Sequence, residues 1–420
     1  MPTVFPNILR SSRFRILKIV MSFAVSSCAA IASEPPMLDL TRTGPDPTRI
    51  DYDSLLVLRG EHALVTAGSL TEQPFVSKSV VFDHADLADP SQWVYRLHSY
   101  LAYHDGKYWA LWSHGRIVED HPTQHLRYAT SPDGLHWSDA GIVAGPPTRD
   151  GFRYIARGLW VRDGKLIALG SLDEAYQEGR VRFFGPSLAL HAFEWDPTRE
   201  VWIPQGAIAD QAINNFPPAK LPDGRWGIIC RGPDYRRNVF MLSGGVDAID
   251  SWEKSPIVTE APADGFRPEE PNWWSLPDGR LVGVFRDNSR SGRFYRAFSA
   301  DNGRTWSTPT KTNFPDATAK FFCLRTSRGF YVLISNANPA SRNPLCLSVS
   351  EDGVTFTAMA QLPIPVSPEG GAFDADHTSG SVQYPHAIEQ DGAVFVSYSR
   401  YKTAIEVIKI SLDEIERLRR

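Results

Sequence analysis

A short polar turn followed by an apolar strand recurs six times along the chain, and this repeat limits the folds that the sequence can adopt. The six copies read HDGKYWALW, RDGKLIALG, PDGRWGIIC, PDGRLVGVF, SRGFYVLIS and QDGAVFVSY, with turn residues Asp105, Asp163, Asp223, Asp278, Arg328 and Asp391 before the glycines. Asp-Gly favours two-residue hairpin turns, because both central positions of such a turn need positive φ. The separations of 58, 60, 55, 50 and 63 residues suit one four-stranded sheet per copy. The repeat therefore predicts an all-β fold, a six-bladed β-propeller of antiparallel four-stranded sheets.

A second turn motif follows three of these hairpins. SADNGRTW (299–306) matches the Asp-box pattern S-x-D-x-G-x-T-W, and SPDGLHW (131–137) and SEDGVTF (350–356) are shorter versions of it. In an Asp-box the carboxylate caps backbone N–H groups and the aromatic residue packs beneath the turn. We therefore expect structural and not catalytic roles for Asp133, Asp301 and Asp352. Helical character is confined to the C-terminal SLDEIERLRR.

The first 32 residues have the pattern of an export signal. Four basic residues and no acidic one accompany the apolar run ILKIVMSFAVSSCAAIA, which ends at the small-residue site Ala30-Ile31-Ala32. We expect residues 1–32 to be a signal peptide and 33–420 to be one propeller domain, in a secreted or periplasmic protein. Val25-Ser26-Ser27-Cys28 also resembles a bacterial lipobox, so an outer-membrane lipoprotein acylated at Cys28 is the alternative.

Charge and cysteine content limit the kinds of partner and cross-link that the protein can have. The chain has 44 basic and 48 acidic residues, and without the four basic residues of the signal 40 basic residues remain. The mature chain is therefore net negative and has no general attraction for nucleic acid. Cys230, Cys323 and Cys346 allow one disulfide at most, and buried thiols are the alternative. No other segment is long and apolar enough for a transmembrane helix. His121 and His125 are four apart, but Pro122 argues against a helical metal pair, and we expect neither metal nor cofactor.

Charged residues are predicted to converge on one rim of the propeller. If the Asp-Gly turns share one face, the opposite ends of the innermost hairpins meet around the axis on the other face. Counting back from the turns gives Arg96, Asn215, Glu270, Lys320 and Tyr384, and counting forward gives Arg231, Arg286, Asn336 and Arg400, with Arg116 and Asp120 following the first hairpin. Several arginines in one pocket repel one another unless an anion binds there, and guanidinium groups bind carboxylates bidentately. We therefore expect an acidic ligand.

These segments resemble the exo-α-sialidases (neuraminidases), which are six-bladed propellers with Asp-boxes. The similar segments are YRLHSYLAYHDGKYWALWSHGR, EEPNWWSLPDGRLVGVFRDN, SNANPASRNPLCLSVSEDG and VQYPHAIEQDGAVFVSY. The resemblance implies that Arg96, Arg286 and Arg342 form the carboxylate-binding triad. It also implies a pocket arginine at Arg116, the acid/base at Asp120, and a Tyr384 nucleophile activated by Glu270. His98 stands where the family has proline, and Glu269 competes with Glu270 because a one-residue slip exchanges their faces.

The chemistry that the resemblance implies is retaining hydrolysis of a terminal sialic acid or a related acidic sugar from an acidic glycan. A neutral tyrosine approaches an anomeric carbon that carries a carboxylate more easily than a charged nucleophile does. Two alternatives stay open. If His98 and His386 both face the pocket beside Tyr384, a histidine–tyrosine pair is compatible with a polysaccharide lyase acting on uronic acids, and the propeller is also compatible with non-catalytic glycan binding.

Overall fold

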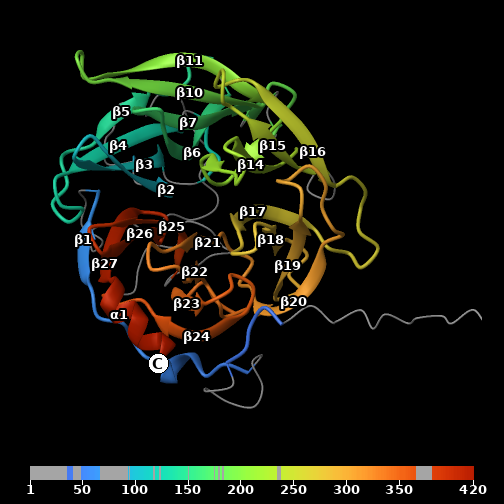
Figure 1. Cartoon of the computed structure of the whole chain (residues 1–420). Helices are drawn as coiled ribbons and strands as arrows, with labels where there is room; N and C mark the ends of the chain where they lie inside the picture. The colour runs from blue at the N-terminus through green and yellow to red at the C-terminus, as the bar shows by residue number, and fades with distance from the viewer. Residues whose placement is uncertain are drawn as a thin grey trace, which may run out of the picture. The chain divides into compact units, whose positions relative to one another are not determined.

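The computed structural model describes residues 36–40, 49–66, 93, 95–116, 119–122, 124–149, 151–174, 176–177, 180–181, 184–233, 238–365 and 381–420. The predicted signal segment 1–32 and Cys28 lie outside these residues. The described residues belong to one compact unit, Pro35–Arg420, in which six antiparallel sheets stand around an axis (Figure 1). The predicted all-β, six-bladed propeller is confirmed.

Blades 1 to 3 follow one another along the chain. Blade 1 has the order β2 (Tyr95–His104), β3 (Lys107–Gly115), β4 (His125–Ser131) and β5 (Gly141–Ala144). Blade 2 contains β6 (Phe152–Arg162), β7 (Lys165–Glu174), β10 (Ala189–Asp196) and β11 (Val201–Asp210), with a small ribbon of β8 (Tyr176–Gln177) and β9 (Arg180–Val181). In blade 3, β12 (Ile213–Asn214) and β13 (Ala219–Lys220) both pair with β14 (Trp226–Arg231), which β15 (Val239–Gly244) and β16 (Trp252–Val258) follow. The innermost strand of blade 3 is thus interrupted.

Blades 4 to 6 complete the ring. Blade 4 contains β17 (Pro268–Ser275), β18 (Leu281–Asp287), β19 (Arg293–Ser299) and β20 (Thr310–Pro315). Blade 5 contains β21 (Phe322–Arg325), β22 (Tyr331–Ser335), β23 (Cys346–Ser350) and β24 (Phe356–Gln361). Blade 6 contains β25 (Val382–Gln390), β26 (Ala393–Arg400), β27 (Ala404–Ser411) and, from the other end of the chain, β1 (Glu61–Leu64). Short helical segments are η1 (Tyr52–Ser54), α1 (Leu412–Glu416) and η4 (Arg417–Arg419), so the C-terminal helix is confirmed.

Strand β1 closes the ring by joining the last blade. It pairs antiparallel with β27, where Glu61 lies opposite Lys409, and Figure 1 shows it in blue beside the red strands. No turn motif precedes this strand in the sequence, and the repeat did not predict it. The closure covers the outer edge of β27, which otherwise offers unpaired backbone groups.

The hairpin turns are of two kinds. Asp105, Asp163 and Asp391 have positive φ together with the glycine that follows each, as the sequence predicts. In the other three turns only the glycine has positive φ. Their loops are one residue longer: in blade 4, for example, the hydrogen bond from Leu276 N to Arg280 O encloses three residues instead of two. This difference affects how positions are counted back from each turn.

The Asp-box aspartates hold their own turns, as predicted. Asp301 Oδ1 accepts from Thr305 N at 2.9 Å, and Asp133 Oδ1 accepts from His136 N at 2.8 Å. Asp352 Oδ1 accepts from Thr355 N at 2.8 Å. These carboxylates satisfy backbone donors at the outside of the blades.

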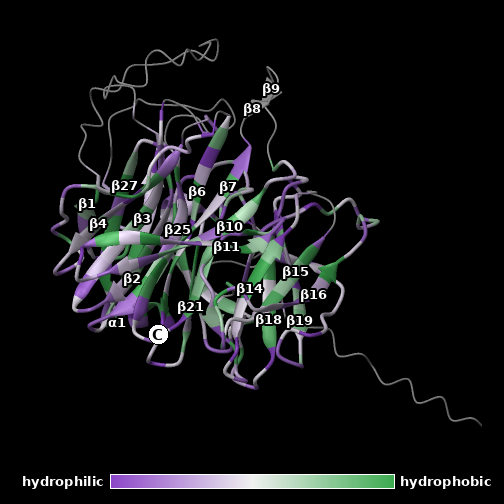
Figure 2. Cartoon of the chain, turned by 90° about the horizontal axis from the view of Figure 1, so that it is seen from above, coloured by the Kyte–Doolittle hydropathy of each residue, from purple (hydrophilic) through white to green (hydrophobic). Residues whose placement is uncertain are grey.

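Hydrophobic side chains fill the spaces within and between the blades. Figure 2 shows hydrophobic residues along the strands and hydrophilic residues mainly in the loops. Cys230, Cys323 and Cys346 are free thiols buried in this core, so the alternative of buried thiols is confirmed for them. Within the described ranges, no helix is long and apolar enough to cross a membrane.

Candidate active site

Three innermost strands carry a non-glycine residue in the left-handed backbone region at the same structural position. These residues are His98 in β2 (φ 54°), Glu270 in β17 (φ 41°) and Tyr384 in β25 (φ 61°). In each strand the register with the next strand shifts across that residue. Such bulges turn a side chain out of the regular alternation, and the left-handed conformation costs an L-residue about 1–2 kcal/mol. Strain of this kind collects at functional sites, where the surrounding structure holds it in place.

The three bulged residues line one cavity of about 170 Å³ among the innermost strands. Its lining consists of His98, Glu119, Asp120, Ile155, Arg157, Phe184, Ile213, Asn215, Arg231, Glu269, Glu270, Arg286, Asn288 and Tyr384. We call it the axial cavity. Four of the seven site residues predicted from the sequence lie here, namely Asp120, Glu270, Arg286 and Tyr384. It also receives Asn215 and Arg231, which the rim geometry had placed near the axis.

Tyr384, Glu270 and Arg286 form one buried group. Arg286 Nη1 donates to Glu270 Oε2 and lies 3.4 Å from Tyr384 Oη, and the phenol of Tyr384 is hydrogen-bonded to Glu270. All three residues are buried. Glu269 turns to Arg231 instead, and contacts its Nε. Because Glu270 occupies the bulge, both neighbouring glutamates reach the cavity, each with its own arginine.

Electrostatics keep the tyrosine neutral and the glutamate ionised in the absence of a ligand. Burial raises the pKa of Tyr384 above its usual value, and the negative charge of Glu270 raises it further. Burial also raises the pKa of Glu270, but Arg286, Arg342 and the hydrogen bond from Tyr384 outweigh it, so the net pKa is lowered. The pair thus holds a proton donor directly against a charged acceptor.

Two buried arginines near this group have only neutral hydrogen-bond partners among the described residues. Arg342 donates to the side chain of Gln383 and to Thr318 O, and its guanidinium carbon lies 5.5 Å from the ring centre of Tyr384. Arg157 donates to Ser171 Oγ at 2.8 Å and lies 3.5 Å from Asn215 Oδ1. Burial lowers the pKa of both. An anion bound between them would offset the cost of burying these charges.

Asp120 and Glu119 occupy the wall of the axial cavity next to β2. Asp120, whose side chain is 32% exposed, contacts Arg153. Nη2 of Arg153 also lies 3.0 Å from Asp173 Oδ2. Glu119 contacts Lys402 Nζ and lies 3.8 Å from His98 Nε2. Burial lowers the pKa of His98 well below its usual value, and the charges of Arg157 and Lys320 add to this. His98 is therefore neutral, beside two carboxylates.

Arg96 and Arg116 do not line the axial cavity, and here the predicted geometry needs correction. Arg96 stands opposite His114 just before the bulge of β2, and its Nη1 donates to Thr403 O at 2.5 Å. It lines a separate, larger cavity. The bulge gives the axial position to His98, so the structure does not bring Arg96 together with Arg286 and Arg342. Arg116 is buried at the end of β3, outside the lining.

Other positions also differ from the sequence expectation. Arg157 was missed because the counts from the turns named no residue of blade 2, although Arg157-Gly158 in an apolar strand was an available signal. His386 lines a different cavity, where its Nδ1 accepts from Leu101 N at 3.1 Å. Arg400 pairs with Glu406 at 2.7 Å, away from the axial cavity.

Lys320 lies near Tyr384 and is fully buried. Its Nζ lies 4.0 Å from the ring centre of Tyr100, 4.7 Å from that of Phe216 and 5.9 Å from that of Tyr384. Nζ has no hydrogen-bond partner within the described part of the chain. Burial lowers the pKa of Lys320 to about 7 even though Glu270 favours the charged form. The amine is therefore able to change its charge near neutral pH.

Solved structures of sialidases share this fold. A protein described as a sialidase has 18% identity and a TM-score of 0.58, covering 90% of this chain and 34% of its own, so the chain spans about a third of its length. The NanB sialidase from Streptococcus pneumoniae has 11% identity and a TM-score of 0.58, covering 78% of this chain and 70% of its own. A protein of unknown function from Dyadobacter fermentans has 14% identity and a TM-score of 0.60, covering 84% of this chain and 99% of its own. Identities this low show the fold alone.

Sequence comparison gives a family. No curated protein matches the chain. The model of the BNR repeat-like domain matches residues 119–396, which span blades 1 to 6 and include Asp120, Glu270 and Tyr384. The chain therefore belongs to the BNR repeat-like domain family, as a propeller of the sialidase-like kind.

Proposed function

We propose that the protein is an exported glycoside hydrolase of the sialidase type, which releases a terminal sialic acid or a related acidic sugar from glycans with retention of configuration. The observation that carries the proposal is the buried group of Tyr384 and Glu270, in which Arg286 contacts both the phenol and the carboxylate. A phenol paired with a carboxylate in an arginine-lined cavity suits attack on an anomeric carbon that bears a carboxylate. The bulges that hold Tyr384 and Glu270 support a role for which their positions matter.

Arg286 and Arg342 bind the sugar carboxylate in this proposal, with Arg157 adding positive charge to the axial cavity. The neutral partners of Arg342 and Arg157 support this assignment, because a bound carboxylate supplies the anionic partner that they lack. Arg342 is not among the lining residues of the axial cavity either, but its guanidinium carbon lies 5.5 Å from the ring centre of Tyr384. Arg96 lines the other cavity and Arg116 lines neither, so we assign neither of them a contact with the sugar carboxylate.

Proton transfer from Tyr384 to Glu270 then responds to the ligand. In the free protein the positive charges of Arg286 and Arg342 hold the pKa of Glu270 down. When these arginines pair with the substrate carboxylate, they stabilise ionised Glu270 less, and it becomes a better base. Tyr384 Oη bonds to the anomeric carbon as the glycosidic C–O bond breaks, and the phenolic proton passes to Glu270.

Asp120 is the proposed acid and base. It protonates the departing glycosidic oxygen and then removes a proton from the water that attacks the glycosyl-tyrosine. The second step breaks the bond between Tyr384 and the sugar, and Glu270 returns its proton to the phenolate. Glu119 is the competitor for this role, because it lines the same wall.

A lyase acting on uronic-acid glycans is the second candidate, and the pairing of His98 with Tyr384 favours it. Their ring centres lie 5.4 Å apart, and His98 is neutral and available as a base. Such an enzyme removes the proton next to the carboxyl group and leaves an unsaturated sugar.

The deciding experiment compares the products formed from sialosides and from uronate oligosaccharides. A saturated free acidic sugar whose first NMR signal is the α-anomer supports the proposal. An unsaturated product absorbing in the ultraviolet supports the lyase, and a β-anomer first excludes a retaining tyrosine. Binding of these glycans without turnover would identify a non-catalytic binding propeller.

A further inference from the structure

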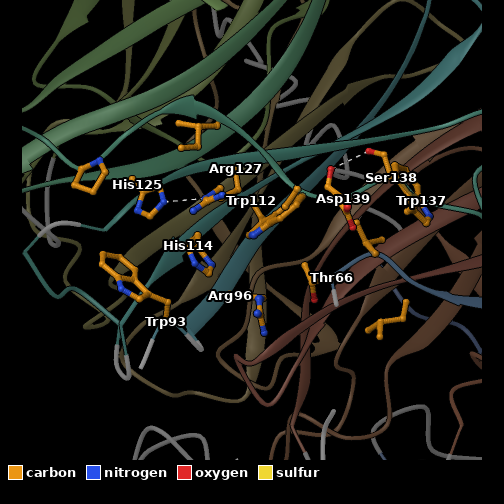
Figure 3. A pocket seen from close by; sticks show the side chains of 15 residues that line it. Thr66, Trp93, Arg96, Trp112, His114, His125, Arg127, Trp137, Ser138 and Asp139 are labelled. Atoms are coloured by element: carbon orange, nitrogen blue, oxygen red, sulfur yellow. Dashed lines mark hydrogen bonds between the residues drawn. The ribbon is translucent and has the colours of Figure 1, made fainter. Parts of the chain in front are cut away.

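A second cavity of about 600 Å³ is lined in part by Arg96 and shares no described lining residue with the axial cavity. It is lined by blade 1 and by the segment that follows β1, and Figure 3 shows its side chains from close by. Its volume falls in the range of ordinary small-molecule sites. We call it the blade-1 cavity, and none of the residues proposed for catalysis lines it.

Positive charge dominates its lining. Arg96 and Arg127 both face the cavity, and burial together with the charge of Arg127 lowers the pKa of Arg96 to about 10. Arg127 Nε donates to His125 Nε2 at 3.0 Å, which leaves its two Nη groups without a partner among the described residues. Among the described lining residues the single carboxylate is that of Asp139, which is exposed and makes no ion pair with Arg127. The two Nη groups of Arg127 are thus available to an anion.

Aromatic and neutral polar groups complete the lining. Trp93 stacks on His114 with ring centres 5.9 Å apart and 16° between the planes, and His125 meets His114 edge-on at 5.1 Å. Burial, followed by the charges of His125 and Arg96, lowers the pKa of His114 to about 2, so its ring is neutral.

Two polar atoms of this lining are buried without a partner in the described structure: Trp112 Nε1 and His114 Nδ1. Trp112 is only 1% exposed. A buried donor or acceptor without a partner costs about 1–3 kcal/mol, which a ligand hydroxyl would recover.

We propose that the blade-1 cavity is a second, non-catalytic binding site for a carboxylated sugar ring. The carboxylate pairs with the Nη groups of Arg127, hydroxyl groups bond to Trp112 Nε1 and His114 Nδ1, and the apolar face of the ring packs on tryptophan. This explains a charged residue within the aromatic run of β2: Arg96 serves this cavity, while His98, two residues further on, serves the axial one. The site does not depend on turnover at Tyr384.

The test measures binding of free N-acetylneuraminic acid and D-glucuronic acid by calorimetry and by tryptophan fluorescence. Arg286→Gln weakens the axial site, and in that variant one binding event with altered tryptophan emission is expected to remain. Adding Arg127→Gln should weaken this event at least tenfold, whereas Arg199→Gln, at an exposed arginine in blade 2, should leave it unchanged. Trp112→Phe, which keeps an aromatic ring but removes the N–H, should weaken it severalfold.

The methyl esters of the same sugars give a test without any mutation in the blade-1 cavity. They are expected to bind the Arg286→Gln protein at least tenfold more weakly than the acids, whichever acid binds better. Loss of all sugar binding in Arg286→Gln, or equal affinity after Arg127→Gln, would overturn the proposal. Displacement of the sugar by equimolar acetate or phosphate would also overturn it, because it would show that the site binds small anions without contacts between the sugar ring and the tryptophans.

Discussion

The innermost strands β2 and β17 have the same distortion but use it differently. In β17 the bulge turns Glu270 into the axial cavity, and the preceding Glu269 also reaches it. In β2 the bulge turns His98 into that cavity and leaves Arg96 on the blade-1 cavity. The comparison shows that the bulged position, more than the residue type, decides which side chain faces the axis.

The largest expected effect is on the chemistry of the bulged tyrosine. Tyr384→Phe removes the nucleophilic oxygen and should lower kcat by roughly 10³-fold or more while acidic-sugar binding changes little, because the phenol acts mainly in the transition state. Steady-state kinetics and calorimetry measure the two quantities. Tyr128→Phe, in blade 1 outside the axial cavity, is the matched control. Full activity of Tyr384→Phe would show that the bulge of β25 does not position a nucleophile.

Lys320 lies between the bulged strands, and its charge should appear in the stability of the protein. Its pKa is about 7 in the folded state and about 10.5 when unfolded, so between these values the unfolded chain binds a proton that the folded one does not. The free energy of unfolding should therefore rise with pH by about 1.4 kcal/mol per unit from this group. Lys320→Met removes that slope. In urea unfolding at pH 7, 8 and 9, the difference in free energy of unfolding between the variant and the wild type should therefore shift in favour of the wild type as the pH rises. Parallel curves for the two proteins would mean that Lys320 keeps its charge throughout.

The two arginines predicted as equivalent should differ in binding. Arg286→Lys keeps the charge but loses the fork, which should weaken binding at the axial cavity by about 1.5–3 kcal/mol, or roughly 10- to 150-fold. Arg96→Lys should change that affinity by less than about threefold, because Arg96 faces the other cavity. Calorimetry with an acidic sugar in an Arg127→Gln background isolates the axial site. Equal losses of affinity in both variants would show that Arg96 does bind the sugar carboxylate together with Arg286.

The smallest effect is expected outside both cavities. Asp301→Ala removes the cap on Thr305 and should lower the free energy of unfolding by about 1 kcal/mol without changing turnover. Denaturant unfolding and kinetics on the same preparation would check it. A loss of turnover in a stably folded variant would contradict the purely structural role of the Asp-boxes.

The sequence predicted the blades because each one contains a turn that needs particular residues. Asp-Gly turns and Asp-boxes mark the chain locally, and they gave six four-stranded sheets and the hairpin at the centre of each. The closing strand β1 (Glu61–Leu64) was not predicted, because its only partner lies at the far end of the chain and no turn motif joins them.

Counting positions from the turns placed Glu270 and Tyr384 at the axis but did not consider bulges in the strands. His98, Glu270 and Tyr384 each stand six positions before the last paired residue of their hairpin, at His104, Leu276 and Gln390. Counting from the aspartates hid this agreement, since the turn after β17 is one residue longer than the other two. A bulge has no residue signature as strong as a turn glycine, so Arg96 was placed at the axis.

The closure by β1 has a consequence for how the protein forms. His62 and Glu406 contact each other at 3.0 Å although they are 344 positions apart, so blade 6 is incomplete until nearly the whole chain has been made. Contacts between such distant segments form slowly, because a long loop must close before they contribute stability. We therefore expect ring closure to be a late step in folding, with β27 exposed as an edge until β1 arrives. While the chain folds, the open edge of blade 6 is a place where it can pair with a neighbouring copy.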